Sequence, residues 1–303
     1  MRARPAISPR LSAGKGAPPP SPCAPSLSET YQLLTRTCES LQVAIAPDGG
    51  GDPSVPDGQW VDGAALAARP DLLDAAIDGE AARIQGRFGT EPRREVAASR
   101  FMHHYLWSVG LLISGPWYLA RRVPRIRPRD LRIHPATAEL ALAPGGFTCF
   151  PDDPAAGRPG VRTVAHEEAL RAELRSAYAD HVRPLIAAAA PAMRRGPRAL
   201  WGMAGDDLVS GVWYLGRMLD EEDRSVRRAG QLLPTAVPPF PKGADFRALY
   251  GSSGREWPTR TRAGCCLYYA IRPSAASGEE QPQACGTCPR VTDAERVRRL
   301  EAE

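Results

Sequence analysis

Residues 262–269 read Arg-Ala-Gly-Cys-Cys-Leu-Tyr-Tyr, and residues 284–290 read Ala-Cys-Gly-Thr-Cys-Pro-Arg. The two segments hold four of the seven cysteines of the chain, as two closely spaced pairs. Two cysteine pairs that meet in space offer four thiolates to a zinc ion or an iron–sulfur cluster. We therefore expect the upstream chain to form a body that holds this site and presents a substrate to it.

The spacing of the cysteines leaves three kinds of site open. In Cys285-x-x-Cys288 the two thiolates can converge on one metal atom. Adjacent cysteines such as Cys265 and Cys266 tend to diverge, so they suit the two irons of a [2Fe–2S] cluster better than one zinc ion. Spacing alone favours the cluster over structural zinc, and zinc over redox-active disulfides.

Charge and motifs bear on the class of partner. The 303 residues carry a net charge of +5, and the arginines are scattered among carboxylates, without a basic stripe. Binding to nucleic acid is therefore not expected. The sequence shows no Gly-rich nucleotide-binding motif, so the electrons of any redox reaction are expected to come from a separate donor.

We expect a cytoplasmic location. The most apolar run, residues 105–120, falls short of the ~18 apolar residues that cross a bilayer and is interrupted by polar residues, glycines and Pro116. The basic N-terminus lacks the apolar core of a secretory signal. We expect no transmembrane segment, which is compatible with peripheral association at the inner membrane. In a reducing compartment, clustered thiols indicate metal or redox chemistry more often than structural disulfides.

The predicted fold class is α+β, mainly α-helical with a small antiparallel β-sheet and a cysteine-rich C-terminal segment that binds the cluster. Residues 1–25, rich in Pro, Ser, Ala and Gly, are expected to be a disordered tail. Residues 26–250 are expected to form a helical body. Short alternating runs around 125–150 predict antiparallel strands within it. Residues 251–303 are expected to form the [2Fe–2S]-binding segment.

Helices are expected where apolar residues recur at helical spacing. These ranges are 29–45, 62–88 with an interruption at Pro70, 93–112, 165–184 with an alanine-rich continuation to about 193, 201–219 and 293–302. Ser28 and Asp293 are the expected N-caps of the first and last helices. Pro116 is expected to end or kink the third.

Other candidate ligands have simpler explanations. His103 and His104 are neighbours on a predicted helix, about 100° apart, so they do not form a metal pair and we expect a packing or surface role. Cys38 is expected to be a small buried hydrophobe. Cys149 is expected in or beside a strand, and Cys23 lies in the predicted tail.

The sequence Cys-Cys-Leu-Tyr-Tyr at 265–269, followed by Cys-Gly-Thr-Cys-Pro at 285–289, resembles the C-terminal signature of the FhuF-like ferric siderophore reductases. The likeness is specific over residues 255–290. Upstream, Arg-Ala-Leu-Trp-Gly at 198–202 and the helix after it are similar to the helix that precedes the cluster segment in that family. Eighteen residues separate the two cysteine pairs here, against about ten in the family. The extra segment, 273–283, is expected to bulge as a loop without moving the ligands.

The resemblance implies a [2Fe–2S] cluster whose cofactor and metal ligands are Cys265, Cys266, Cys285 and Cys288. It implies an oxidoreductase that transfers single electrons to Fe(III) in a cytoplasmic ferric siderophore and releases Fe(II). No general base or nucleophile is needed, so no catalytic residue is expected beyond the cluster. Two alternatives stay open: a non-enzymatic iron–sulfur electron carrier or redox sensor, and a zinc-stapled interaction module.

Arginines bracket the cysteine motif. Four thiolates, two sulfides and two ferric ions carry a charge of about −2, and reduction makes it more negative. A buried site therefore needs compensating cations or N–H donors. Arg260, Arg262 and Arg290 are the candidates. The substrate groove is expected between the helices and the cluster segment.

Overall fold

The computed structural model describes residues 26–47, 53–55, 58–252 and 254–302. It is mainly α-helical with small β-sheets, which confirms the predicted α+β fold class. The predicted tail at 1–25, with Cys23, lies outside the described residues. None of the helices in the described ranges combines the length and the apolar character needed to cross a lipid bilayer.

The helices follow the predicted order closely over most of the chain. They are α1 Leu27–Thr37, α2 Gly63–Ala68, α3 Pro70–Phe88, α4 Arg94–Ala120, α5 Glu167–Met193, α6 Pro197–Met218, α7 Glu222–Leu232 and α8 Asp293–Ala302, with 3₁₀ turns η1 Pro128–Asp130 and η2 Tyr268–Ala270. The interruption at Pro70 is confirmed, because this proline opens α3 at its first turn, where no N–H is needed. The two predicted helices between 165 and 193 form one continuous helix, α5.

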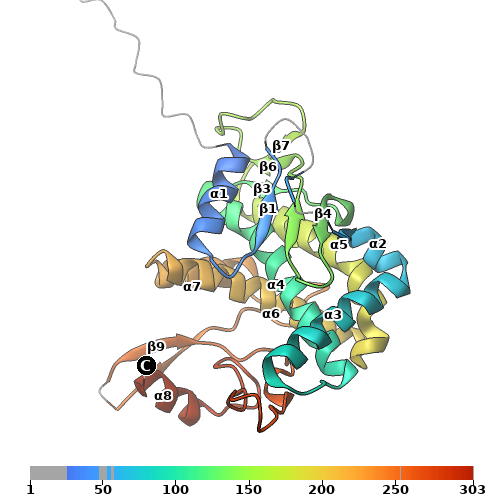
Figure 1. Cartoon of the computed structure of the whole chain (residues 1–303). Helices are drawn as coiled ribbons and strands as arrows, with labels where there is room; N and C mark the ends of the chain where they lie inside the picture. Colours follow the sequence, from blue (N-terminus) through green and yellow to red (C-terminus); the bar gives the residue numbers. More distant parts are fainter. Residues whose placement is uncertain (1–25, 48–52, 56–57, 253, 303) are drawn as a thin grey trace, which may run out of the picture.

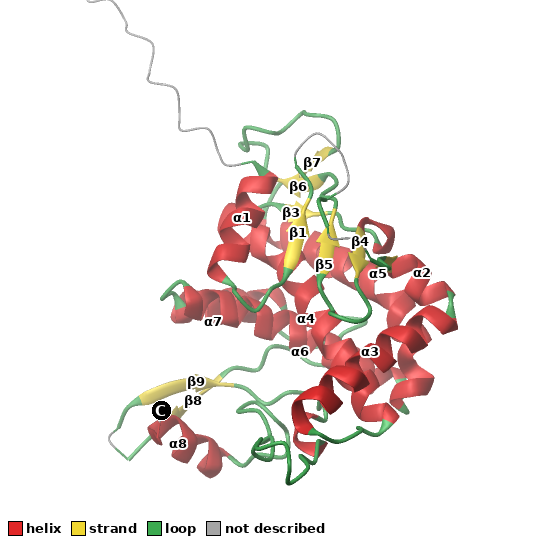
Figure 2. Cartoon of the chain, viewed as in Figure 1, coloured by secondary structure: helices red, strands yellow, loops and turns green. Residues whose placement is uncertain are grey.

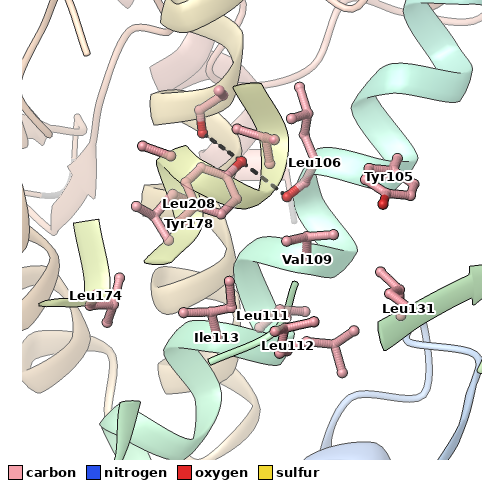
Figure 3. Close-up of a cluster of buried hydrophobic side chains, with 14 of the residues drawn as sticks. Tyr105, Leu106, Val109, Leu111, Leu112, Ile113, Leu131, Leu174, Tyr178 and Leu208 are labelled. Atoms are coloured by element: carbon pink, nitrogen blue, oxygen red, sulfur yellow. Dashed lines mark hydrogen bonds between the residues drawn. The ribbon is translucent and has the colours of Figure 1, made fainter. Parts of the chain in front are cut away.

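Helix α4 is the centre of the core. Its residues are almost all buried, because α1, α3, α5 and α6 surround it. An added Cβ on Gly110 would lie 3.3 Å from the Leu208 Cα, so glycine permits the close approach of α4 and α6. The Tyr178 hydroxyl of α5 lies 3.1 Å from the Leu106 carbonyl oxygen and 3.0 Å from that of Ala204 (Figure 3). This hydroxyl therefore links α5 to both α4 and α6.

Helix α4 runs beyond its predicted end at residue 112 and does not end at Pro116, which is one of the two effects predicted for this proline. Proline has no N–H to donate to the carbonyl oxygen four residues earlier, which belongs to Leu112. The Tyr31 hydroxyl of α1 donates to that oxygen at 3.0 Å. A tertiary hydrogen bond thus replaces the missing helical one, and α4 continues to Ala120.

The strands form two small mixed sheets and a hairpin. The first sheet has the order β1 (Val43–Ile45), β5 (Leu140–Leu142), β4 (Leu131–Ile133), β2 (Val61–Asp62), with β1 parallel to β5. The second has the order β3 (Val123–Pro124), β6 (Phe147–Cys149), β7 (Val161–Thr163). The predicted antiparallel pairing holds between β4 and β5, whereas β6 pairs in the second sheet.

The predicted first helix was wrong at both ends. Ser26, not Ser28, is the N-cap, in a capping box with Glu29. The helix stops at Thr37, and residues 43–45 pair with β5 as a strand. Val43 and Ile45 favour a strand once a partner is available, and helical spacing alone does not reveal that partner.

The cysteine segment lies on the opposite side of the helices from the two mixed sheets. Figure 1 shows the segment in orange and red below α4, α6 and α7, with the sheets above them. A hairpin of β8 (Arg247–Tyr250) and β9 (Glu256–Thr259) leads into it, and α8 follows it (Figure 2). The hairpin spans the predicted domain boundary at residues 250 and 251.

Candidate metal centre

The structure brings the four predicted ligand cysteines together in two pairs. The Cys266 side chain meets that of Cys285, and the Cys265 side chain meets that of Cys288. Each cysteine of the adjacent pair thus finds one cysteine of the Cys-x-x-Cys pair. Cys266 and Cys288 are buried, Cys265 is half-buried and Cys285 is exposed. All six cysteines in the described part of the chain are free thiols.

The segment before Cys265 is fixed onto helix α6. The Gly264 N–H donates to Asp206 Oδ2 at 2.8 Å. An added Cβ on Gly264 would lie 3.1 Å from the Met203 Cβ, so only a glycine fits here without displacement. Arg195 also donates to the Cys265 carbonyl oxygen. The adjacent cysteines are therefore held by α6 and by the turn that precedes it.

The residues after Cys266 are anchored to α3 and α4. Ile271 packs into a small hydrophobic cluster with Ile84, Phe88 and Val96. The Tyr268 ring lies edge-on to Phe88, with ring centres 6.3 Å apart. The predicted loop 273–283 is confirmed as irregular, and it is tied down where the Ser274 N–H donates to the Phe88 carbonyl oxygen.

Helix α8 holds the Cys285–Cys288 loop from the other side. Arg296, which is buried, donates to the carbonyl oxygens of Gly286 and Cys288, both at 2.7 Å. Arg299 donates to the Ala284 carbonyl oxygen at 2.7 Å. The Thr292 hydroxyl, not the predicted Asp293, caps this helix by accepting from the Glu295 N–H at 3.3 Å. Two arginines one turn apart therefore satisfy the carbonyls of the loop.

Buried charges lie between the cysteines and the helical core. Asp206 and Asp207 project from α6, and Arg260 and Arg262 come from the strand-to-motif connection. Arg260 donates to Asp206 Oδ1 at 2.6 Å, and Arg262 donates to Asp207 Oδ1. His103 Nδ1 lies 2.8 Å from the same Asp207 oxygen, and a carboxylate only accepts, so this nitrogen carries the proton.

These ion pairs shift the pKa values of Asp207 and Arg262. Burial opposes the charged form of Asp207, but Arg262 and His103 outweigh it and hold its pKa below the usual value. Burial likewise opposes the charged form of Arg262, but Asp207 and Asp206 raise the pKa of its guanidinium. Cys266 and Cys285 add to this effect. Arg262 is therefore a permanent cation beside two of the four sulfurs.

Several donors face the sulfurs. The Leu267 N–H donates to Cys265 Sγ at 3.4 Å, and the Tyr268 amide contributes to lowering the pKa of Cys266. The interaction with the Cys285 side chain is the main reason that the pKa of Cys266 falls to about 4. The pKa of Cys265 is raised, chiefly by burial.

One buried donor near the sulfurs is unpartnered. Arg262 Nε–H finds no hydrogen-bond acceptor among the residues that the structure describes, and Asp206 Oδ2 is 3.9 Å away from it. Burying an N–H without an acceptor costs about 1–3 kcal/mol. A sulfide or thiolate of a metal–sulfur group held between the cysteine pairs would be such an acceptor. The residues present therefore fit a [2Fe–2S] cluster.

The arrangement of the four cysteine sulfurs also differs from that of a site for a single metal ion. Across the described ranges, no three His, Cys, Asp or Glu side chains are grouped so that they could hold one metal ion. The sulfurs lie in two pairs. Such an arrangement suits two metal atoms, each with two thiolates, better than one tetrahedral zinc.

The structure also places the three arginines that bracket the motif and the two cysteines outside it. Of the three bracketing arginines, Arg262 lies beside the cysteines, and Arg260 is buried against Asp206. Arg290 is exposed over the Tyr269 ring, 4.9 Å from its centre. Cys38 is buried in the core, as predicted, and Cys149 ends strand β6.

Sequence reasoning missed the residues that build the charge network. His103 was expected to pack or face solvent, yet it pairs with Asp207, whereas His104 packs as expected, against the Ala138 carbonyl oxygen at 3.1 Å. Asp206 and Asp207 interrupt an otherwise apolar helix. Two adjacent carboxylates on a helix with a wide buried face are the signal that could have identified them, because buried carboxylates require partners.

A cavity of about 640 Å³ opens beside the Cys285–Cys288 loop. Gly286 and Thr287 of that loop form part of its wall, together with Trp213 and Arg217 of α6. The hairpin, which includes Trp257, and α8 supply most of the remaining wall, and Glu222 of α7 also lines it. It therefore lies between the helices and the cysteine segment, where the substrate groove is expected.

Comparison with protein-family models and with curated proteins found no match for this chain.

Proposed function

We propose that this protein is a [2Fe–2S] oxidoreductase that passes single electrons to Fe(III) in a cytoplasmic ferric siderophore and so releases Fe(II). The observation that carries the proposal is the meeting of two sequence-distant cysteine pairs beside the buried Arg262. The likeness of the two cysteine segments to the FhuF-like reductases supports the same assignment.

Cys265, Cys266, Cys285 and Cys288 would hold the cluster. When bound, a [2Fe–2S] cluster supplies a one-electron couple. The chain's own residues prepare the site for added negative charge, because Arg262 contributes a fixed cation and the Leu267 amide donates to the Cys265 sulfur. The exposure of Cys285 gives an electron acceptor access to this edge of the site.

The electron balance needs one partner on each side. A separate one-electron donor is oxidised, and the Fe(III) of the chelate is reduced to Fe(II). No bond to the protein forms or breaks. The hard oxygen ligands of a siderophore hold Fe(III) more tightly than Fe(II), so reduction loosens the complex. The protein therefore has to position the chelate, and it needs no general base.

The direct test is a single-turnover reaction. Protein reduced anaerobically with one electron equivalent of dithionite, half a mole per mole of cluster, is mixed with ferric siderophores while a ferrous-specific chromogenic chelator traps the product. We expect the cluster absorbance to return as Fe(II) appears, with about one Fe(II) per reduced cluster. A cluster that stays reduced with every ferric chelate would reject the reductase and leave an electron carrier or sensor.

A further inference from the structure

We propose that the cavity beside the Cys285–Cys288 loop binds the substrate, and that it selects an anionic ferric chelate with aromatic, catecholate-type arms. The inference rests on the proposed function, because it names the substrate class of the same site. Three observations carry it: the position of the cavity, the charge of its wall and its two tryptophans.

The position places a ligand next to the cysteines. Gly286 and Thr287 lie between the two cysteines of the loop, and both line the cavity. The backbone N–H of Arg262 donates to the Thr287 carbonyl oxygen at 2.9 Å. This bond joins the cavity wall to the segment that carries Cys265 and Cys266. The volume of about 640 Å³ is in the range of pockets for compact organic ligands.

The charge of the wall favours an anion. Arg217, Arg255, Arg296 and Arg299 line the cavity, with Glu222 as its one lining carboxylate. Arg296 and Arg299 are engaged by the loop carbonyls and by carboxylates of α8. Arg217 is the most available, since its side chain is 56 % exposed and its Nε lies 4.0 Å from Glu222.

The tryptophans favour aromatic arms. The Trp213 Nε1–H donates to Glu222 at 2.7 Å, which fixes the indole ring against the cavity. The Arg255 guanidinium lies over Trp257, 5.2 Å from the ring centre. Arginine and tryptophan side by side bind planar anions through charge and aromatic rings through stacking. A tris-catecholate complex offers both features, whereas a tris-hydroxamate complex of a trivalent metal is uncharged and lacks the aromatic rings.

Gallium(III) chelates test the binding without electron transfer. The purified full-length protein, its iron and zinc content assayed, is titrated in a calorimeter with two hexadentate Ga(III) chelates, a tris-catecholate and an uncharged tris-hydroxamate. The variants are Arg217→Gln and Arg255→Gln. The matched control is Arg183→Gln, because Arg183 is also 56 % exposed and has its carboxylate partner, Asp180, at 3.9 Å, but it does not line the cavity.

We expect saturable binding of the tris-catecholate, at least roughly tenfold tighter than of the tris-hydroxamate, and a loss of roughly fivefold in each cavity variant. Arg183→Gln should bind like the unaltered protein. Absent binding, equal binding of the two chelates, or equal binding by all variants would overturn the inference. Because Ga(III) is not reduced, a protein without a cluster that still binds the tris-catecholate would reject the proposed function and keep only the cavity as a binding site for the anionic chelate.

Discussion

Arg262 forms a buried ion pair with Asp207 of α6, and the same guanidinium lies beside Cys266 and Cys285. The carboxylate is fully buried, and the arginine side chain is 6 % exposed. The pair therefore places opposite charges in a medium of low dielectric next to the cysteines. A change of charge on a group held by those cysteines will therefore change its electrostatic energy with both Arg262 and Asp207.

The first prediction concerns the reduction potential. Arg262→Gln removes a cation that favours the more negative reduced state, so the potential should fall by about 60 mV or more, the one-electron equivalent of ~1.4 kcal/mol. Asp207→Asn removes an anion and should raise the potential. Both are measured by anaerobic redox titration of the visible absorbance.

A buried arginine far from the cysteines provides the control. Arg122 is 3 % exposed and pairs with Asp153 through two hydrogen bonds, at 2.8 and 2.9 Å. Arg122→Gln should reduce stability, as loss of a buried ion-pair partner does, without shifting the potential. Shifts of equal sign in Arg262→Gln and Asp207→Asn would contradict the electrostatic explanation.

The second prediction concerns the hydrogen bonds by which α8 holds the Cys285–Cys288 loop. Arg296→Gln removes two charged hydrogen bonds to the carbonyl oxygens of Gly286 and Cys288. We expect the iron to be lost to a chelator at least roughly tenfold faster. Arg298→Gln in the same helix is the control, because Arg298 is 79 % exposed and pairs with Glu295. Equal rates of loss in the two variants would show that α8 does not hold the loop.

The third prediction concerns pH. His181 Nδ1 donates to the Ile126 carbonyl oxygen at 2.9 Å, and its Nε2 lies 2.9 Å from the Tyr105 hydroxyl. Burial lowers the pKa of His181 from 6.5 to about 4. Between pH 6.5 and about 4, His181 is therefore protonated in the unfolded chain and neutral in the folded chain. The free energy of unfolding should fall by up to about 3 kcal/mol as pH drops from 6.5 towards 4.

Denaturant unfolding at several pH values measures this effect. His181→Gln should be less stable at neutral pH but should lose less stability between pH 6.5 and 4 than the unaltered protein does. Part of the slope should persist, because burial also lowers the pKa of His104. Identical slopes in the two proteins would show that His181 does not titrate in this window.

The fourth prediction concerns the ligands. Serine at Cys265, Cys266, Cys285 or Cys288 should remove the visible spectrum, since each supplies one of four thiolates. Cys38→Ser and Cys149→Ser should keep it, because these thiols lie in the core and in β6; Cys23→Ser should keep it as well. A spectrum that survives serine at one of the four would remove that residue from the ligand set.

Local sequence patterns predicted the elements whose partners lie nearby. Helices α3, α5, α6 and α8 appear where apolar spacing and prolines place them. Other elements depended on distant contacts. Helix α4 passes Pro116 with a hydrogen bond from Tyr31 in place of the missing helical one, and β1 pairs with the distant β5. Helix α7 was missed because its residues are mostly polar and few are buried.

In the candidate metal centre, too, local sequence patterns were predictive and contacts between residues distant in sequence were not. The four cysteines were identifiable because they form two closely spaced pairs, a pattern typical of metal and redox sites. The pairing of His103 and Arg262 with Asp207 was not, since these residues are far apart in sequence and each has an ordinary surface role available to it. Arg296 and Arg299, which line the cavity, lie on α8. The alternating charges of this helix are typical of a solvent-exposed surface, so the sequence did not indicate their contacts with the cysteine loop.

The presence of the cluster is the central claim, and one measurement tests it most directly. An anaerobic ultraviolet–visible spectrum of the purified protein is recorded before and after dithionite, with iron and zinc assayed on the same sample. We predict a red-brown protein with about two irons per chain whose colour bleaches on reduction. A colourless protein with about one zinc per chain would contradict the claim and leave a zinc-stapled interaction module.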